Sequence, residues 1–124
     1  MLVNGGELFG NRLLSPSTAS LMSSNQVGDL FSGMPGAFEL FSNVQGFGYT
    51  VATSEDPIAS KQGRSKGAFG WNGAMGALSW SDPAEELTAV IMIQQPVRAV
   101  QGDFEKAVYE AIIHADQGSG IKEH

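Results

Sequence analysis

The stretch Trp71-Asn72-Gly73 combines residue types that can shape a binding edge for an acyl group. It follows the apolar pair Ala68-Phe69, so we expect the main chain here to end a strand. Acyl transfer places negative charge on a carbonyl oxygen, and N–H groups fixed at a strand edge stabilise that charge. Gly73 has no Cβ and lets the chain pass close to a substrate, while Asn72 could hydrogen-bond an acyl side chain and Trp71 could form an apolar wall.

A plainer interpretation of these residues stays open at this point. Asn-Gly is the strongest short signal for a hairpin turn, so Asn72-Gly73 also fits a type I′ turn that only joins two strands. Trp71 taken alone fits a core or surface aromatic residue. The glycines at 70, 73 and 76 do not form a phosphate-binding loop, because no P-loop lysine follows them.

Other residue types that carry chemistry are scarce. The chain has no cysteine, which excludes disulfides, a thiolate nucleophile and zinc-cysteine sites. The two histidines, His114 in a helical pattern and His124 at the last position, are expected to be structural or incidental. We therefore expect no metal and no cofactor, and we identify no serine with an activating base beside it.

Composition and charge limit the classes of protein and partner. With 42% hydrophobic and 16% charged residues the chain is globular in type, and 16 glycines favour an antiparallel sheet over a helix bundle. A net charge of −6 disfavours nucleic acid and anionic membranes as partners. The basic cluster of Lys61, Arg64 and Lys66 fits a solvated loop. No apolar run reaches the ~20 residues that span a bilayer.

Strand patterns dominate the middle of the chain. Before them, Ser15-Pro16 can begin a helix that runs through Met22, and residues 25–44 fit a long irregular loop. Alternation predicts a strand over residues 46–54, and three more strands follow at 67–71, 77–81 and 88–94. The last strand is almost continuously apolar, which predicts burial on both faces in the middle of a sheet.

A final helix completes the predicted fold. Asp103 can cap it, and its apolar stripe comprises Phe104, Ala107, Val108, Ala111 and Ile112. The short links between strands imply antiparallel neighbours. The predicted fold class is α+β, an antiparallel β-sheet with a C-terminal helix packed across it.

Five pieces in order give the chain a resemblance to a known family. They are Leu2-Val3-Asn4-Gly5-Gly6-Glu7-Leu8, Arg12-Leu13-Leu14-Ser15-Pro16, Gly46-Phe47-Gly48-Tyr49, Gly70-Trp71-Asn72-Gly73-Ala74-Met75-Gly76, and Trp80-Ser81-Asp82-Pro83 with residues 86–94. Together they resemble the β-lactamase-related family of esterases and penicillin-binding proteins. The resemblance implies that residues 1–124 are the C-terminal segment of such a domain, with part of the β-lactamase/transpeptidase-like fold.

The resemblance also implies a role for the stretch at 71–74. The third active-site motif of this family is Lys-Thr-Gly in β-lactamases and commonly Trp-Gly-Gly or His-Gly-Gly in esterase-like members. Trp71, Asn72 and Gly73 match its three positions, and the N–H of Ala74 matches the second oxyanion donor. A neutral indole replaces the lysine, which favours ester or amide substrates. A β-lactamase or a D-amino-acid peptidase is an alternative within the family.

The family's nucleophile lies in a Ser-x-x-Lys motif, followed by Tyr-x-Asn or Ser-x-Asn, in a part of the domain that precedes this segment. We expect neither motif here and no hydrolysis by the isolated chain. The leading hypothesis is a fragment of a serine hydrolase, whose whole protein binds a small-molecule ester or amide. The alternative is a non-catalytic remnant or interaction module, which would form homo-oligomers through exposed sheet edges.

Overall fold

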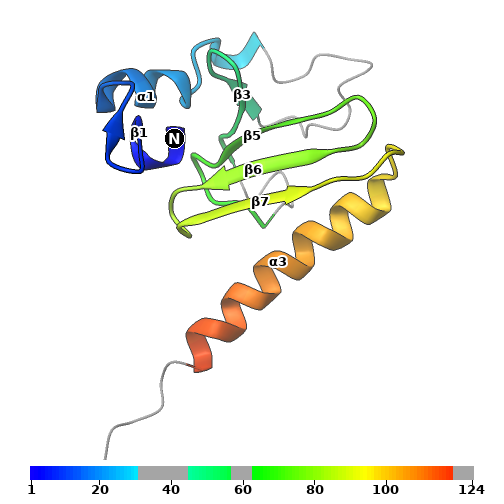
Figure 1. Cartoon of the computed structure of the whole chain (residues 1–124). Coiled ribbons are helices and arrows are strands. Elements are labelled where there is room, and N and C mark those ends of the chain that lie inside the picture. Colours follow the sequence, from blue (N-terminus) through cyan, green and yellow to red (C-terminus); the bar gives the residue numbers. More distant parts are fainter. Residues whose placement is uncertain (31–44, 57–62, 119–124) are drawn as a thin grey trace, which may run out of the picture.

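The computed structural model describes residues 1–30, 45–56 and 63–118 (Figure 1). The helical elements are η1 (Leu2–Asn4), α1 (Pro16–Met22), η2 (Gly28–Leu30) and α3 (Arg98–Gly118). The strands are β1 (Glu7–Leu8), β2 (Asn11–Arg12), β3 (Gln45–Phe47), β4 (Ala52–Ser54), β5 (Phe69–Asn72), β6 (Leu78–Asp82) and β7 (Leu87–Ile91). No helix within these ranges is long and apolar enough to cross a membrane.

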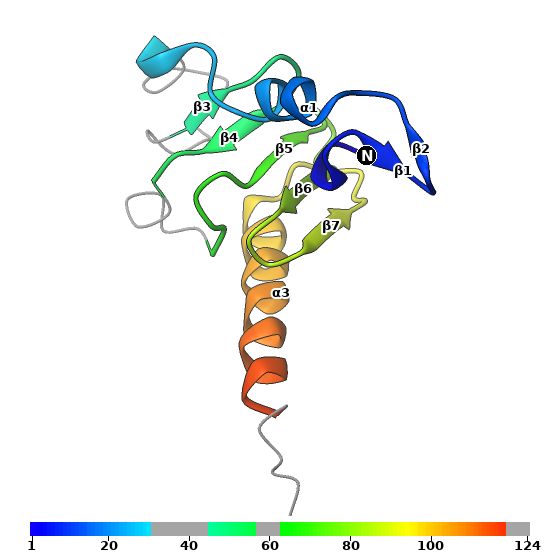
Figure 2. The same ribbon diagram turned by 90° about the vertical axis from the view of Figure 1, so that its left-hand side faces the viewer.

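The main sheet has five antiparallel strands in the order β3-β4-β5-β6-β7, so each strand pairs with the next along the chain. β1 and β2 form a separate hairpin. Helix α3 contacts the sheet and extends beyond it at its C-terminal end (Figures 1 and 2). The predicted α+β class, an antiparallel sheet with a C-terminal helix, is confirmed.

The single strand predicted over residues 46–54 is wrong, because this stretch folds into the β3–β4 hairpin. The Gly48 N–H donates to the Val51 carbonyl at 2.8 Å and closes the turn. A Cβ on Gly48 would lie 2.1 Å from the main-chain oxygen of Met22 in α1, so only glycine fits there. Alternation alone does not distinguish a strand from a hairpin whose turn falls inside the pattern.

The prediction that the fourth strand is buried on both faces is also wrong. β7 ends at Ile91 and is an outer strand of the described sheet. Ala89 is buried, whereas its neighbour Val90 is 55% exposed and Met92 is 81% exposed. The apolar run therefore covers one buried face and one face that no described element buries.

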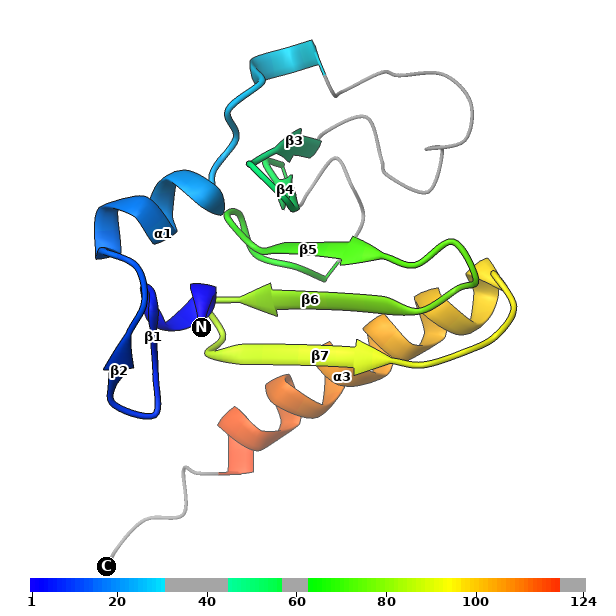
Figure 3. The ribbon, with the colours of Figure 1, turned by 45° about the horizontal axis from the view of Figure 1, so that its top comes forward.

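Helix α3 begins at Arg98, earlier than the predicted cap at Asp103. Its Tyr109 joins the buried core of the sheet, and further α3 residues pack against that core. The core residues are Leu78, Trp80, Ala89 and Tyr109, and the partly buried ones from α3 are Phe104, Val108 and Ile112. Ala107 and Ala111, predicted to face the sheet, are exposed, because the helix is turned so that the larger side chains fill the interface. Figure 3 shows α3 crossing behind β6 and β7.

The N-terminal elements pack at one end of the sheet. α1 begins where predicted: the Ser15 hydroxyl accepts a hydrogen bond from the Thr18 N–H at 3.1 Å. The Tyr49 N–H donates to the Met22 carbonyl at 3.2 Å, and the Gln26 N–H to the Phe47 carbonyl at 2.8 Å. Of the loop predicted over 25–44, residues 31–44 lie outside the described residues.

Candidate functional site

The stretch 71–74 leads from the end of β5 into a turn. Asn72 pairs with Leu78 as the last residue of the strand. The Gly73 N–H donates to the Ala77 carbonyl at 2.7 Å, and the Gly76 N–H donates to the Gly73 carbonyl at 3.0 Å. The turn therefore spans residues 73–76, with Gly76 at φ +99°, and the type I′ turn at Asn72-Gly73 is wrong.

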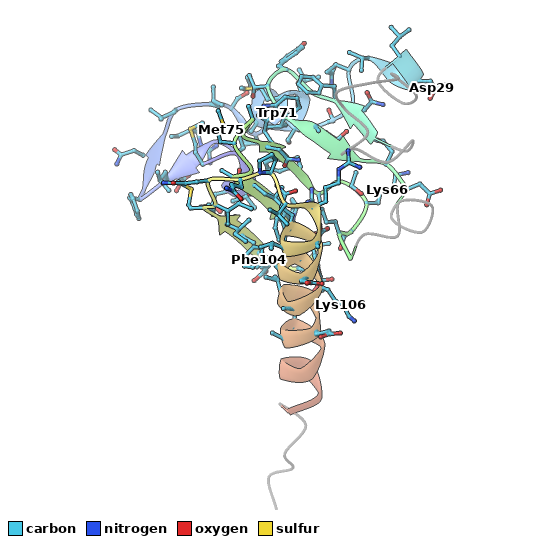
Figure 4. The ribbon with its side chains drawn as sticks, turned by 90° about the vertical axis from the view of Figure 1, so that its right-hand side faces the viewer. Asp29, Lys66, Trp71, Met75, Phe104 and Lys106 are labelled. Atoms are coloured by element: carbon cyan, nitrogen blue, oxygen red, sulfur yellow. The ribbon has the colours of Figure 1, made fainter. Side chains whose placement is uncertain are left out.

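Trp71 lies on the surface of the sheet near its end. Its side chain is 38% exposed and meets the Phe47 ring edge to face, with ring centroids 5.2 Å apart. Figure 4 shows Trp71 and Met75 at the end of the molecule opposite Lys106 of α3. Met75 is 71% exposed, and Asn72 is partly buried. A partly exposed aromatic ring thus lies just before the turn, and an exposed thioether lies within it.

Ala74 is exposed, and its N–H donates no hydrogen bond to any described residue. It is the second residue of the turn, and its N–H takes no part in the hydrogen bonds that close the turn. Such a donor can bind an acceptor from outside the chain. The role of Ala74 as an oxyanion donor stays a prediction, as do those of Trp71, Asn72 and Gly73 in binding a substrate.

A glutamine of α3 reaches this turn. Gln101 Nε2 donates to the Gly76 carbonyl at 2.8 Å, and the Gln101 side chain is buried. Sequence reasoning placed Gly76 in the stretch that resembles the third motif, but it did not identify Gln101 as part of the site. No local signal marks Gln101, because 25 residues separate it from Gly76 and only the packing of α3 brings the two together.

A buried polar network lies between the sheet and α3. Asp82 is fully buried, and its Oδ2 accepts hydrogen bonds from the Tyr109 hydroxyl at 2.7 Å and from the Ser65 N–H at 2.8 Å. Trp80 Nε1 donates to the Tyr109 oxygen at 3.1 Å. Burial, and then the hydrogen bond to Asp82, raise the pKa of the Tyr109 hydroxyl well above its ordinary range. The network holds Tyr109 neutral and anchors α3.

An ion pair extends this network. The Arg64 guanidinium lies 4.7 Å from the centre of the Trp80 ring and contacts both carboxylate oxygens of Glu105, at 2.8 and 3.2 Å. The Arg64 and Glu105 side chains are only 11% and 12% exposed. The assignment of Arg64 to a solvated basic loop is therefore wrong, although Lys66 is exposed as expected and Lys61 lies outside the described residues.

Two stretches have the spacing of the motifs that we expected to be missing. Ser23-Ser24-Asn25 matches Ser-x-Asn, but the Asn25 side chain bonds the main chain of Val27, Gly28 and Phe47 and so shapes a turn. Residues 119–122 match Ser-x-x-Lys, follow the last residue of α3 and lie outside the described residues. The expectation that neither spacing occurs is thus wrong.

The described residues contain no group of three or more His, Cys, Asp or Glu side chains placed to hold a metal ion. The side chain of His114 and all of His124 lie outside the described residues.

Sequence comparison relates the chain to part of longer proteins. No family model matches it. Protein Rv1367c of Mycobacterium tuberculosis is 31% identical over 102 residues, covering 76% of this chain and 24% of that protein. Uncharacterized protein MT1414, from another strain of the same organism, matches to the same extent. The chain thus spans about a quarter of the length of these relatives, at 24%.

Two solved structures share the fold. EstCE1, described as a hydrolase with promiscuous acyltransferase activity, superposes with a TM-score of 0.66 at 22% identity, covering 89% of this chain and 26% of its own. A mutant of simvastatin synthase LovD from Aspergillus terreus superposes with a TM-score of 0.61 at 21% identity, covering 82% and 30%. The chain therefore has the fold of the C-terminal portion of the β-lactamase-fold hydrolases.

Proposed function

We propose that this chain forms one wall of the acyl site of a β-lactamase-fold serine hydrolase whose whole protein acts on esters or amides. The observation that carries the proposal is that Ala74, an exposed residue just after the end of β5, has an N–H that donates no hydrogen bond within the described chain. The fold shared with EstCE1 supports it, since EstCE1 is described as a hydrolase with promiscuous acyltransferase activity.

Each residue of the stretch has a role in this proposal. The Ala74 N–H donates to the carbonyl oxygen as negative charge develops on it, and Gly73 keeps the approach free of a Cβ. Asn72 hydrogen-bonds the acyl part of the substrate, and the exposed face of Trp71 packs against it. Because Trp71 stands where β-lactamases carry a lysine, uncharged esters or amides are favoured over β-lactams, whose carboxylate would lose its cationic partner.

The first test is covalent labelling. The isolated chain, incubated with a fluorophosphonate, is expected to gain no mass, because no described serine has an activating base. It is also expected not to hydrolyse p-nitrophenyl esters or nitrocefin. An adduct on any serine, Ser119 included, would show that the chain carries its own nucleophile and would contradict the proposal.

The second test supplies the missing part of the domain. In EstCE1, the segment that superposes on this chain is replaced by this chain, and the esterase activity of the resulting exchange protein is measured. Protein Rv1367c, at 31% identity, is a second host. The expected result is an exchange protein that folds and hydrolyses p-nitrophenyl esters. A folded exchange protein, judged by circular dichroism and gel filtration, that lacks this activity would contradict the proposal.

The exposed apolar face of the sheet favours a second candidate function, that of a non-catalytic interaction module. Val90 and Met92 are exposed on and just after the outer strand β7, and Met75 is exposed in the turn. Outer strands with apolar side chains pair readily with further strands. If homo-oligomers form through this edge, sedimentation will detect them and Val90→Lys will dissociate them. A monomer at all concentrations would refute this alternative.

A further inference from the structure

The turn that carries Ala74 is held from outside by the start of α3 and the segment before it. Gln101 Nε2 donates to the Gly76 carbonyl at 2.8 Å, and the Gln101 side chain is only 8% exposed. The Gly76 main chain also packs against the segment just before α3, since a Cβ on Gly76 would lie 2.4 Å from the Gln95 carbonyl oxygen. Gly76 is thus fixed both by a buried hydrogen bond and by close main-chain contact.

The position of Gly76 determines the direction of the Ala74 N–H. The Gly76 N–H donates to the Gly73 carbonyl at 3.0 Å. In a planar trans peptide the C=O of one residue and the N–H of the next point in opposite directions. Because the Gly73 carbonyl is held toward Gly76, the Ala74 N–H must point the other way, toward the outside of the turn.

We propose that Gln101 is a positioning residue for the Ala74 amide, acting through Gly76 and Gly73. An effect of Gln101 on catalysis rests on the proposed function, in which the Ala74 N–H is an oxyanion donor. Such a donor must be oriented before the reaction begins. Without the Gln101 donor, the Gly76 carbonyl loses its buried partner and the peptide between Gly73 and Ala74 can rotate.

The turn itself is tested in the full chain by amide hydrogen exchange. In Gln101→Met, which removes the donor at similar size, the Gly73 and Gly76 amides are expected to exchange at least tenfold faster, and the Trp80 amide of β6 much less so. Gln94→Met, at an exposed glutamine, is the matched control. Unchanged exchange at Gly73 and Gly76, or an equal increase at Trp80, would overturn the proposal.

Gln101→Glu separates hydrogen bonding from packing. Its carboxylate cannot donate to the Gly76 carbonyl at neutral pH, whereas the protonated acid can donate below the ordinary glutamate pKa of about 4.3. Relative to the parent chain, protection of Gly73 and Gly76 is expected to be lost at pH 7 and regained near pH 4. If the ratio of the Gly73 and Gly76 exchange rates in Gln101→Glu to those in the parent chain does not change with pH, Gln101 does not act as a hydrogen-bond donor.

The effect of Gln101 on catalysis is tested in the exchange protein made from EstCE1. Gln101→Met is expected to lower kcat at least tenfold with KM nearly unchanged, because the oxyanion forms after substrate binding. If hydrogen exchange at Gly73 and Gly76 becomes faster but kcat does not fall, Gln101 stabilises the turn, and the role of Ala74 in acyl transfer is refuted. The two failures are therefore distinguishable.

Discussion

The Tyr109 hydroxyl donates a 2.7 Å hydrogen bond to Asp82 Oδ2, and this contact joins helix α3 to the last residue of strand β6. The same Tyr109 oxygen accepts from Trp80 Nε1 at 3.1 Å. The tyrosine thus satisfies two buried polar groups at once. The contact ties α3 to the sheet, and the same helix carries Gln101, which donates to the Gly76 carbonyl in the turn at 73–76.

Removal of this hydroxyl is expected to destabilise the chain. Tyr109→Phe leaves the Trp80 indole N–H without an acceptor and takes one donor from Asp82, so the free energy of unfolding should fall by about 1–3 kcal/mol. Urea denaturation measures the change. In a double-mutant cycle with Asp82→Asn, the two losses should be clearly less than additive. Full additivity would mean that the two side chains do not interact.

Alkaline pH is expected to weaken the fold through the same residue. The pKa of Tyr109 is raised above its ordinary value of 10.0 in the folded state, so between pH 10 and the folded pKa the unfolded chain loses a proton that the folded chain keeps. This contribution to stability is complete below pH 10 and declines above it, by up to about 1.4 kcal/mol per pH unit. Denaturation from pH 8 to 11 should show the decline in the parent chain and in Tyr49→Phe, but less in Tyr109→Phe. Identical profiles for all three would contradict it.

Two glycine substitutions should act in opposite directions. A Cβ on Gly70 would lie 2.1 Å from the Ser79 carbonyl oxygen, so Gly70→Ala must separate β5 from β6 and is expected to cost about 3 kcal/mol. Gly102 lies in α3 with no atom near its Cβ position, so Gly102→Ala should stabilise the helix by about 0.5–1 kcal/mol. Thermal denaturation distinguishes the two, and a harmless Gly70→Ala would contradict the β5–β6 packing.

Phe9 adopts a conformation that disfavours its side chain. It occupies the β1–β2 turn at φ +50°, with Gly10 next at φ +77°, and its side chain is 94% exposed. Asparagine tolerates this region much better, so Phe9→Asn should raise the free energy of unfolding by about 1 kcal/mol. Calorimetry measures the shift in Tm. A lower Tm would mean that Phe9 makes a stabilising contact that its exposure does not suggest.

Local patterns in the sequence predicted the elements that depend on neighbouring residues. Ser15 and Pro16 begin α1 because a cap and a fixed φ act within one turn. The rotation of α3 was not predictable, because Ala107 and Phe104 are both apolar and only the fit against Trp80 decides which one faces the sheet. The apolar run of β7 was misread for a similar reason, since apolar residues do not reveal whether a partner covers them.

The candidate site, like the fold, was predictable from the sequence only in the part that neighbouring residues determine. The order of the motifs along the chain predicted the stretch 71–74 as the candidate site, and the turn after it places Gly76 at φ +99°, which favours glycine. The support from Gln101 and the burial of Arg64 against Trp80 depend on contacts between distant segments. Neither follows from spacing along the chain.

The most direct measurement compares Ala74→Pro with Ala74→Ser in the exchange protein with EstCE1. Proline removes the main-chain N–H, whereas serine keeps it, so kcat for p-nitrophenyl esters should fall about 10²–10³-fold in Ala74→Pro and stay near the parent value in Ala74→Ser. Equal kcat values for the two folded variants would show that no oxyanion depends on this amide, and would contradict the account.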